Sequence, residues 1–221
     1  MAGQHAYCPP QEPFLDILYQ DDSLVVLNKP SGLLSVPGRS PENQDSLALR
    51  VQSQFPSALT VHRLDMSTSG VMVMALNKAV HRELSRQFQE RETHKVYYAW
   101  VWGEVTQAAG EVDLPLICDW PNRPRQIVDF EQGKPALTRW EKIREESGNT
   151  LIKLLPHTGR SHQLRVHMQA LGHPILGDEF YAHEAALAAA DHLQLHAAEL
   201  GFVHPDTGEP VVFECPPEFS F

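Results

Sequence analysis

One acidic residue, Asp65, stands in a segment whose composition suits a catalytic carboxylate. It follows an arginine and a leucine, and the turn after it, residues 67–70, consists of serine, threonine and glycine. An apolar run over 71–76 comes next, so this short loop would hold one carboxylate at the end of a strand. An unperturbed aspartate has a pKa of about 3.9, so it is ionised at neutral pH and can act as a nucleophile or a base. The alternative is an ordinary turn whose aspartate caps nearby backbone amides.

A second block, residues 157–167, carries Arg160 and Arg165 around a tight turn that leads into a predicted helix. An arginine presents a rigid fork of N–H donors, which suits a carboxylate or a phosphate group. One of these arginines beside Asp65 would keep that carboxylate ionised, whereas an isolated buried aspartate shifts toward its neutral form. The alternative is a surface helix whose arginines are solvated.

Patterns of apolar residues predict the elements that would position these side chains. Strands are expected over 23–28, 96–102, 111–117, 137–143 and 149–155, with a closing hairpin over 193–203 and 210–215. Helices are expected after caps at Asp45 and Asn77 and over 161–171. Gly172 would end the last helix, with Leu171 facing the core. Because strands come in runs with helices inserted irregularly, the predicted class is α+β with a mostly antiparallel mixed sheet flanked by helices and loops.

The chain is expected to form a single domain over residues 14–221. Residues 1–13 contain three prolines and predict an extended N-terminal arm. The rest shows no internal repeat, low-complexity tract or long linker. The amino terminus lacks a signal-peptide pattern, and the apolar run at 185–190 is far too short to span a bilayer. Three cysteines without a Cys-x-x-Cys pair favour a reducing cytoplasm, so we expect a cytoplasmic protein without membrane association.

The twelve histidines invite comparison with metal sites. His192 and His196 are four residues apart, but no His-Glu-x-x-His pattern surrounds them. His162 and His167 are five apart and would share a helical face poorly. We therefore expect no metal site.

The net charge of −10 is unusual for a protein that binds nucleic acid, because phosphate contacts need lysine and arginine. The charge is unevenly distributed: residues 60–100 carry +2, residues 119–167 carry +3, and the remainder carries −15. The segments with the candidate motifs are thus locally basic, which permits RNA binding without demonstrating it.

Several short motifs occur in order: Lys-Pro-Ser-Gly-Leu at 29–33, His-Arg-Leu-Asp at 62–65, Thr-Ser-Gly at 68–70, Lys-Val-Tyr-Tyr-Ala at 95–99, Gly-Lys-Pro-Ala at 133–136, the block at 159–167, and Gly-His-Pro-Ile-Leu-Gly-Asp at 172–178. Together they resemble the RluA family of pseudouridine synthases, in its short form without an S4-type RNA-binding domain. The resemblance covers nearly the whole chain. It implies a single catalytic domain with the pseudouridine synthase fold, in which a central active-site cleft splits the mixed sheet.

The resemblance implies a cofactor-free isomerisation of uridine within RNA, in which the N1–C1′ bond breaks and a C5–C1′ bond forms. Asp65 would be the essential carboxylate, acting on C1′, on the ring, or as a base. Arg165 would pair with it. Tyr97, on the strand face opposite Trp100 and Trp102, would pack on the target uracil; the alternative is a buried strand tyrosine.

Other arginines would contact RNA. By the same resemblance, Arg63 would fill the space left by the extruded uridine, or else form a structural salt bridge. Arg123 and Arg125 lie in a proline-rigid loop and would bind phosphates together with Arg160. Each of these side chains could instead be solvated.

The loop at 119–125 resembles that of a family member that acts on both ribosomal and transfer RNA. The implied partners are a tRNA anticodon stem-loop and 23S rRNA, with one loop uridine modified in each, and no obligate protein partner. Two alternatives stay open: a non-catalytic RNA-binding or folding helper, and a hydrolase or phosphoryl-transfer enzyme that uses Asp65 with a metal.

Overall fold

The structure, a computed structural model, describes residues 7–219. The chain divides into two compact units. The first comprises the residues up to Thr93 together with Leu200–Pro216, and the second comprises His94–Glu199 with the residues from Pro217 on. The single domain expected over 14–221 stays a prediction.

The described part of the predicted N-terminal arm, residues 7–13, contains no helix or strand. It is held by two side chains: the Tyr7 hydroxyl donates to the Asp45 carbonyl at 2.8 Å, and Arg50 Nη2 donates to the Pro10 carbonyl at 2.8 Å. Residues 1–6 of the arm lie outside the described residues.

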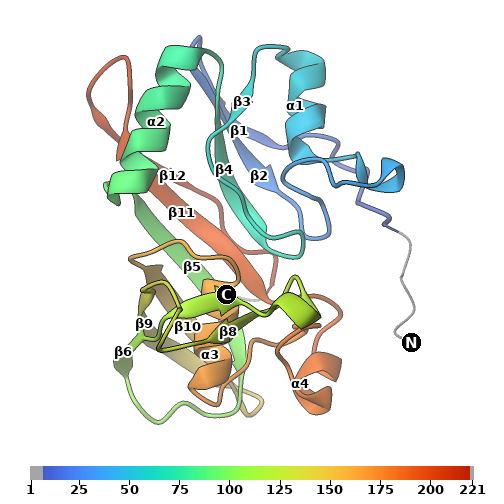
Figure 1. The fold of residues 1–221 in the computed structure, drawn as a ribbon, viewed down its shortest axis with the longest axis vertical. Helices are drawn as coiled ribbons and strands as arrows, with labels where there is room; N and C mark the ends of the chain where they lie inside the picture. The colour runs from blue at the N-terminus through green and yellow to red at the C-terminus, as the bar shows by residue number, and fades with distance from the viewer. Residues whose placement is uncertain (1–6, 220–221) are drawn as a thin grey trace. The chain divides into compact units, whose positions relative to one another are not determined.

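The first unit is built on strands in the order β1-β2-β4-β11 (Figure 1). The strands are β1 (Ile17–Gln20), β2 (Leu24–Lys29), β3 (Leu59–Thr60), β4 (Ser69–Ala75), β11 (Leu195–Val203) and β12 (Pro210–Glu214). β2 pairs with β1 and β4 antiparallel, β3 pairs with β4, and β12 pairs with β11. Lys29 lies opposite Gly70 in the register of β2 and β4, so the end of one strand is beside the start of the other.

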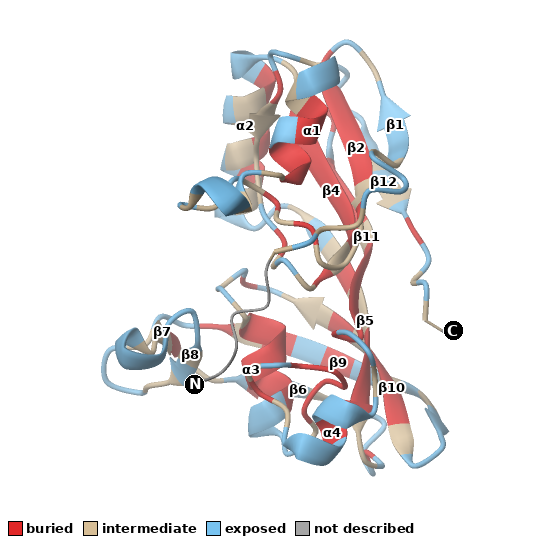
Figure 2. Cartoon of the chain, turned by 90° about the vertical axis from the view of Figure 1, so that its right-hand side faces the viewer, coloured by how far each residue is buried: buried red, intermediate tan, exposed pale blue. Residues whose placement is uncertain are grey.

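Apolar runs explain why β2 and β4 form the centre of this unit. Nearly all residues of both strands are buried, as their red colour in Figure 2 shows. Val26, Val73 and Leu84 are completely buried in one cluster, and burying each contributes about 1.5–3 kcal/mol. Continuous apolar sequence is typical of a strand covered on both faces.

The helices of the first unit are η1 (Pro41–Asn43), α1 (Leu47–Gln54) and α2 (Lys78–Glu90). The predicted cap at Asn77 is confirmed, because its side chain accepts a hydrogen bond from the Val80 amide. The predicted cap at Asp45 is wrong. Ser46 caps α1 instead, and Asp45 accepts two hydrogen bonds from the Arg50 guanidinium. Serine and aspartate both suit a helix cap. Because the Asp45 carboxylate is engaged by Arg50, the cap falls to Ser46.

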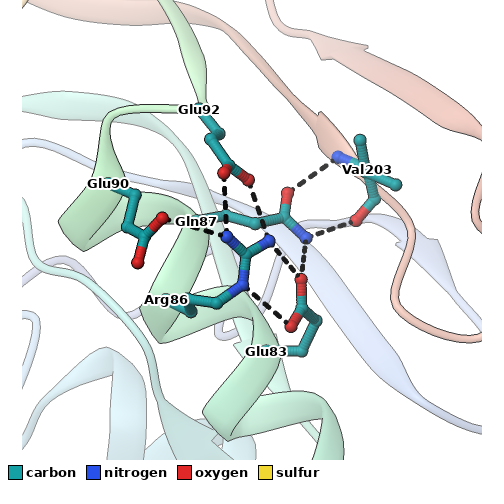
Figure 3. Close-up of polar contacts among 6 residues, drawn as sticks. All are labelled: Glu83, Arg86, Gln87, Glu90, Glu92 and Val203. Atoms are coloured by element: carbon teal, nitrogen blue, oxygen red, sulfur yellow. Dashed lines mark hydrogen bonds and ion pairs between the residues drawn. The ribbon is translucent and has the colours of Figure 1, made fainter.

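A buried amide fixes α2 to β11. Gln87 is fully buried and exchanges two hydrogen bonds with the Val203 backbone, at 2.8 and 2.9 Å (Figure 3). The Gln87 side chain thus satisfies the amide and the carbonyl of Val203, as a neighbouring strand would. Beside it, Arg86 bonds to Glu83 and Glu92 on the exposed side of the helix.

The second unit is built on strands in the order β5-β10-β9-β6, and it also contains residues 195–199 of β11. Its strands are β5 (His94–Trp102), β6 (Ala109–Asp113), β7 (Leu116–Cys118), β8 (Gln126–Val128), β9 (Leu137–Glu146) and β10 (Asn149–Pro156); its helices are η2 (Trp120–Asn122), α3 (Gln163–Ala170) and α4 (Glu184–Ala188). β7 and β8 form a separate two-stranded sheet. The single strand predicted over 111–117 is therefore two strands, and Pro115, which has no backbone N–H to donate, lies between them.

The predicted alternation of β5 is confirmed. Ala99 and Val101 belong to one apolar cluster with Tyr97 packed against it, and Trp100 belongs to a cluster on the other face with Tyr98 and Trp102. The predicted inward orientation of Leu171 is wrong: this residue follows α3 and is exposed. The predicted α+β class, with a sheet and few helices, is confirmed.

Candidate active site

The loop between β3 and β4, residues 61–68, carries Asp65 in the first unit. The Thr68 amide donates to the Asp65 carbonyl at 3.1 Å and closes a tight turn. Leu64 and Thr68 are buried, whereas Asp65 is half-buried and Arg63 is exposed. The buried neighbours therefore anchor the loop while the carboxylate and Arg63 reach its surface.

Residues 31–35, which follow β2, hold the backbone of this loop through hydrogen bonds. The Gly32 amide donates to the Met66 carbonyl at 2.9 Å. The Ser31 hydroxyl donates to the Ser67 carbonyl at 2.8 Å. The Ser35 hydroxyl donates to the Leu64 carbonyl at 2.6 Å and accepts from the Leu64 amide at 3.1 Å. These bonds reach the residues on both sides of Asp65 in the sequence.

Residues 29–35 therefore form a clamp on the backbone of the Asp65 loop. Lys29, at the end of β2, supplies the ionisable side chain of this clamp. Its side chain is fully buried, and Nζ donates to the carbonyls of Pro30, Leu33 and Met66 at 2.9, 2.7 and 3.0 Å. Three carbonyls match the three N–H donors of an ammonium group. Burial lowers the pKa of Lys29 from 10.5 to about 7, and the negative charge of Asp65 opposes this decrease. A buried amine thus lies under the loop and interacts electrostatically with its carboxylate.

His62, earlier in the same loop, is fixed by the surrounding elements. Its Nε2 accepts a hydrogen bond from the Val73 amide at 3.1 Å, and its ring stacks on Phe88 of α2 with centroids 4.4 Å apart. These contacts give His62 a role in positioning the loop against β4 and α2.

In the second unit, Arg165 of α3 forms a buried ion pair with Asp178. Nε and Nη2 donate to the two carboxylate oxygens at 2.8 and 2.6 Å, and both side chains are almost completely buried. Asp178 also accepts hydrogen bonds from the amides of Phe180 and Tyr181, whose rings lie 5.2 Å from the guanidinium. The bidentate pair and the rings hold Arg165 in one orientation.

Gln163 organises the turn that precedes Arg165. Its side-chain oxygen accepts from the Thr158 hydroxyl at 2.6 Å and from the Arg160 amide at 3.0 Å, and its nitrogen donates to the Leu137 carbonyl at 3.0 Å. Arg160 Nε donates to the Pro135 carbonyl at 3.1 Å. The Arg160 side chain is therefore partly engaged within the protein.

Tyr97 lies on the face of β5 that packs against the core of the second unit. It is half-buried and lies opposite Leu154 of β10. The alternation of β5 thus sets the face of the strand on which the Tyr97 ring lies. Part of this side chain stays accessible.

Arg123 and Arg125 are both exposed in the loop between β7 and β8. The Arg123 guanidinium lies 5.2 Å from the Trp120 ring centroid. Arg125 donates to the Phe180 carbonyl and lies 6.0 Å from the Tyr181 ring. Arg125 therefore also has a contact within the protein, whereas Arg123 lies beside an exposed aromatic ring.

Asp65 and Arg63 belong to the first unit, and the other predicted site residues belong to the second. The pairing of Asp65 with Arg165 stays a prediction. Sequence reasoning assigned no role to Lys29, Ser35 or Asp178, although Lys29 and Asp178 stand in motifs that carry the family resemblance. No sequence signal identified Lys29 as part of this arrangement, because lysine is rarely buried.

Within residues 7–219, no helix is long and apolar enough to cross a membrane. The same described part contains no cluster of three or more histidine, cysteine, aspartate or glutamate side chains that could hold a metal ion.

Comparison with known proteins assigns the chain to a family. Residues 23–170 match the family model described as RNA pseudouridylate synthase, so the chain belongs to this family. It is 62% identical over 204 residues to a dual-specificity RNA pseudouridine synthase RluA of Yersinia pestis, covering 92% of this chain and 99% of that protein. It is 59% identical over 218 residues to the protein of the same description from Escherichia coli K12, covering 98% of this chain and all of that protein.

Solved structures agree with the assignment. Human RNA pseudouridylate synthase domain containing 1 superposes with a TM-score of 0.76 at 28% identity, covering 100% of this chain and 88% of that chain. Human RNA pseudouridylate synthase domain containing 4 gives a TM-score of 0.74 at 28% identity, covering 92% of this chain and 89% of that chain. The protein is therefore an isomerase that forms pseudouridine in RNA, which confirms the predicted enzyme class and disfavours the non-catalytic helper.

Proposed function

We propose that this enzyme modifies two kinds of RNA, one loop uridine in 23S rRNA and one uridine in the anticodon loop of certain tRNAs. The proposal is supported by the description of the relatives as dual-specificity enzymes and by the resemblance of the loop at 119–125. The observation that carries the catalytic assignment is the clamp on the Asp65 loop. Backbone carbonyls at Leu64, Met66 and Ser67 are all bound by residues 29–35.

In this proposal Asp65 is the carboxylate that acts on the target nucleotide. A rigid loop suits this role because a catalytic group works best when its position is fixed before the substrate binds. Arg165, itself oriented by Asp178, pairs with Asp65 in this proposal. Tyr97 packs on the target uracil, and no cofactor or metal takes part. Stacking a base on an aromatic ring contributes roughly 1–3 kcal/mol.

Arg63 is the residue that we assign to the space left by the extruded uridine. It is exposed and two residues before Asp65, so it can reach the RNA from the same loop. Arg123, Arg125 and Arg160 are assigned to phosphates. Extruding a base costs least where it is already partly unstacked, as in an RNA loop.

The enzyme is further proposed to act in the cytoplasm without an obligate protein partner. Three cysteines spread over the chain support a reducing compartment.

The test is tritium release from RNA labelled at uracil C5, since forming the C5–C1′ bond displaces that hydrogen. The RNAs are an unmodified tRNA transcript and a 23S rRNA fragment, each made as a series of transcripts in which single loop uridines are replaced. Wild type is compared with Asp65→Asn and with Asp22→Asn, an exposed aspartate in the turn between β1 and β2 that serves as a matched control.

Wild type and Asp22→Asn should release tritium from both RNAs, and Asp65→Asn should release none while still binding RNA. Release from only one RNA would contradict dual specificity. Release by Asp65→Asn at the wild-type rate would contradict the assignment of the carboxylate.

A further inference from the structure

The loop between β7 and β8 exposes a tryptophan that no step of the proposed reaction uses. Trp120 is 67% exposed, whereas Trp100 and Trp140 are buried and Trp102 is half-buried. Burying a large aromatic side chain is a major source of stability. A tryptophan left in solvent on a well-formed loop therefore needs an explanation other than packing.

Hydrogen bonds restrain the backbone of the loop that carries this ring. The Asn122 amide donates to the Asp119 carbonyl at 3.0 Å, and Asn122 Nδ2 donates to the Asp119 carboxylate at 2.9 Å. The Asp119 amide donates to the Arg125 carbonyl at 2.9 Å, which closes the loop at its base. Pro121 and Pro124 restrict the backbone further. A ring on such a loop loses little conformational entropy when a ligand binds.

The Arg123 guanidinium lies 5.2 Å from the centroid of the Trp120 ring. It adds a positive charge beside the ring but leaves two thirds of Trp120 in contact with solvent. An aromatic surface next to an arginine is the arrangement that binds single-stranded nucleic acid: a base stacks on the ring, and the guanidinium contacts a phosphate. Asp119, the residue before Trp120, accepts a hydrogen bond from Asn122 Nδ2, and the two arginines of the loop outnumber this one acid.

We propose that Trp120 and Arg123 form a stacking subsite for an unpaired base of the substrate RNA, distinct from the target uridine. Trp120 stacks on the base, and Arg123 contacts a phosphate of the same strand. The subsite rests on the proposed function in that the ligand is the enzyme's RNA substrate and Arg123 contacts a phosphate; the stacking role of Trp120 goes beyond it. It gives the enzyme a second anchor on a looped RNA, so that a fully paired helix binds more weakly than a loop.

Phe130, beyond the end of β8, provides a matched control. It is 77% exposed, more than Trp120, but its neighbours in sequence are Asp129 and Glu131. The Asp129 carboxylate accepts the amides of Glu131 and Gln132, both at 2.8 Å, and these acids would repel RNA phosphates. We therefore assign no RNA contact to Phe130.

The experiment uses the full chain carrying Asp65→Asn, so that binding is measured without turnover. A fluorescently labelled tRNA anticodon stem-loop transcript reports the dissociation constant by anisotropy, and unlabelled transcript reports quenching of tryptophan fluorescence. Trp120→Ala, Trp120→Phe and Phe130→Ala are compared in this background. Circular dichroism verifies that each variant folds, and Trp120→Phe keeps an aromatic ring should the alanine variant misfold.

Trp120→Ala should weaken binding roughly 5- to 150-fold. Trp120→Phe should recover part of that loss, because a smaller ring still stacks. Both should lose most of the RNA-dependent quenching, and Phe130→Ala should behave like its parent. Binding by Trp120→Ala within twofold of its parent, or quenching that persists without Trp120, would overturn the subsite. Equal losses for Trp120→Ala and Phe130→Ala would overturn it as well.

Turnover separates this inference from the proposed function. With Asp65 present, Trp120→Ala should raise the RNA concentration that gives the half-maximal single-turnover rate by about the factor by which it weakens binding, because the subsite acts in binding. If wild type modifies this RNA but Trp120→Ala binds it as tightly as its parent, the subsite is overturned and the proposed function stays intact. Trp120-dependent binding without wild-type product would support the subsite and contradict the anticodon loop as a substrate.

Discussion

The buried side-chain nitrogen of Lys29 lies 3.0 Å from the carbonyl oxygen of Met66, a residue 37 positions further along the chain. This contact joins the end of β2 to the residue that follows Asp65. Because the same nitrogen bonds two other carbonyls, a displacement of the Asp65 loop would leave a buried amine with incomplete hydrogen bonding. Such a state is costly, so the contact restrains the position of the carboxylate.

Ser35→Ala should weaken the restraint on the loop directly. The variant removes the hydroxyl that bonds both the amide and the carbonyl of Leu64, and buried polar groups left without a partner cost about 1–3 kcal/mol. The free energy of unfolding in urea should fall by that amount, and the single-turnover rate should fall with it. Ser53→Ala, at an exposed serine of α1, is the control. A normal rate in Ser35→Ala would show that the loop does not need this bond for catalysis.

Stability should rise with pH above neutrality because of Lys29. Burial lowers the pKa of Lys29 to about 7, against 10.5 for an ordinary lysine. Between these values the unfolded chain binds the proton and the folded chain does not, so stability increases with pH by at most about 1.4 kcal/mol per unit. Lys29→Met should lose this increase when urea unfolding is compared at pH 7, 8 and 9. Parallel pH profiles for the two proteins would contradict the low pKa.

Arg165→Lys should impair turnover, since a lysine cannot reproduce the two parallel bonds to Asp178. A lost hydrogen bond between charged groups costs about 1.5–3 kcal/mol, which corresponds to roughly 10- to 150-fold in rate if it is expressed in the transition state. Arg86→Lys, on the exposed side of α2, is the matched control and should be nearly normal. Near-normal single-turnover kinetics for Arg165→Lys would mean that this arginine does not serve the reaction.

RNA affinity should fall steeply with salt despite the net charge of −10, because local basic segments neutralise phosphates. Replacing Arg123 with glutamine should reduce the slope of log affinity against log salt by about 0.7, the value for one phosphate of a single strand. Arg86→Gln should leave the slope unchanged, as Arg86 already bonds to Glu83 and Glu92. An identical slope for Arg123→Gln and wild type would exclude the phosphate contact.

The parts of the site that depend on local sequence were predictable. The alternation of β5 follows from a period of two, and the turn at Asp65 follows from its hydroxyl and glycine residues. The clamp was not predictable, because Ser31 and Ser35 find their partners 36 and 29 residues away. Lysine is rarely buried, so the pattern alone favours an exposed Lys29. Only the folded structure brings the Met66 carbonyl, 37 residues away, to the side-chain nitrogen of Lys29.

The role of Asp65 is tested most directly by Asp65→Ala, with pseudouridine quantified by nucleoside chromatography of digested tRNA transcript and with the melting temperature measured on the same preparation. Asp65 is half-buried and its loop is held through backbone groups. The account therefore predicts no detectable pseudouridine and a melting temperature within about 4 °C of wild type, the shift that corresponds to roughly 1 kcal/mol. Pseudouridine formed by the folded alanine variant would contradict the assignment of Asp65 as the catalytic carboxylate.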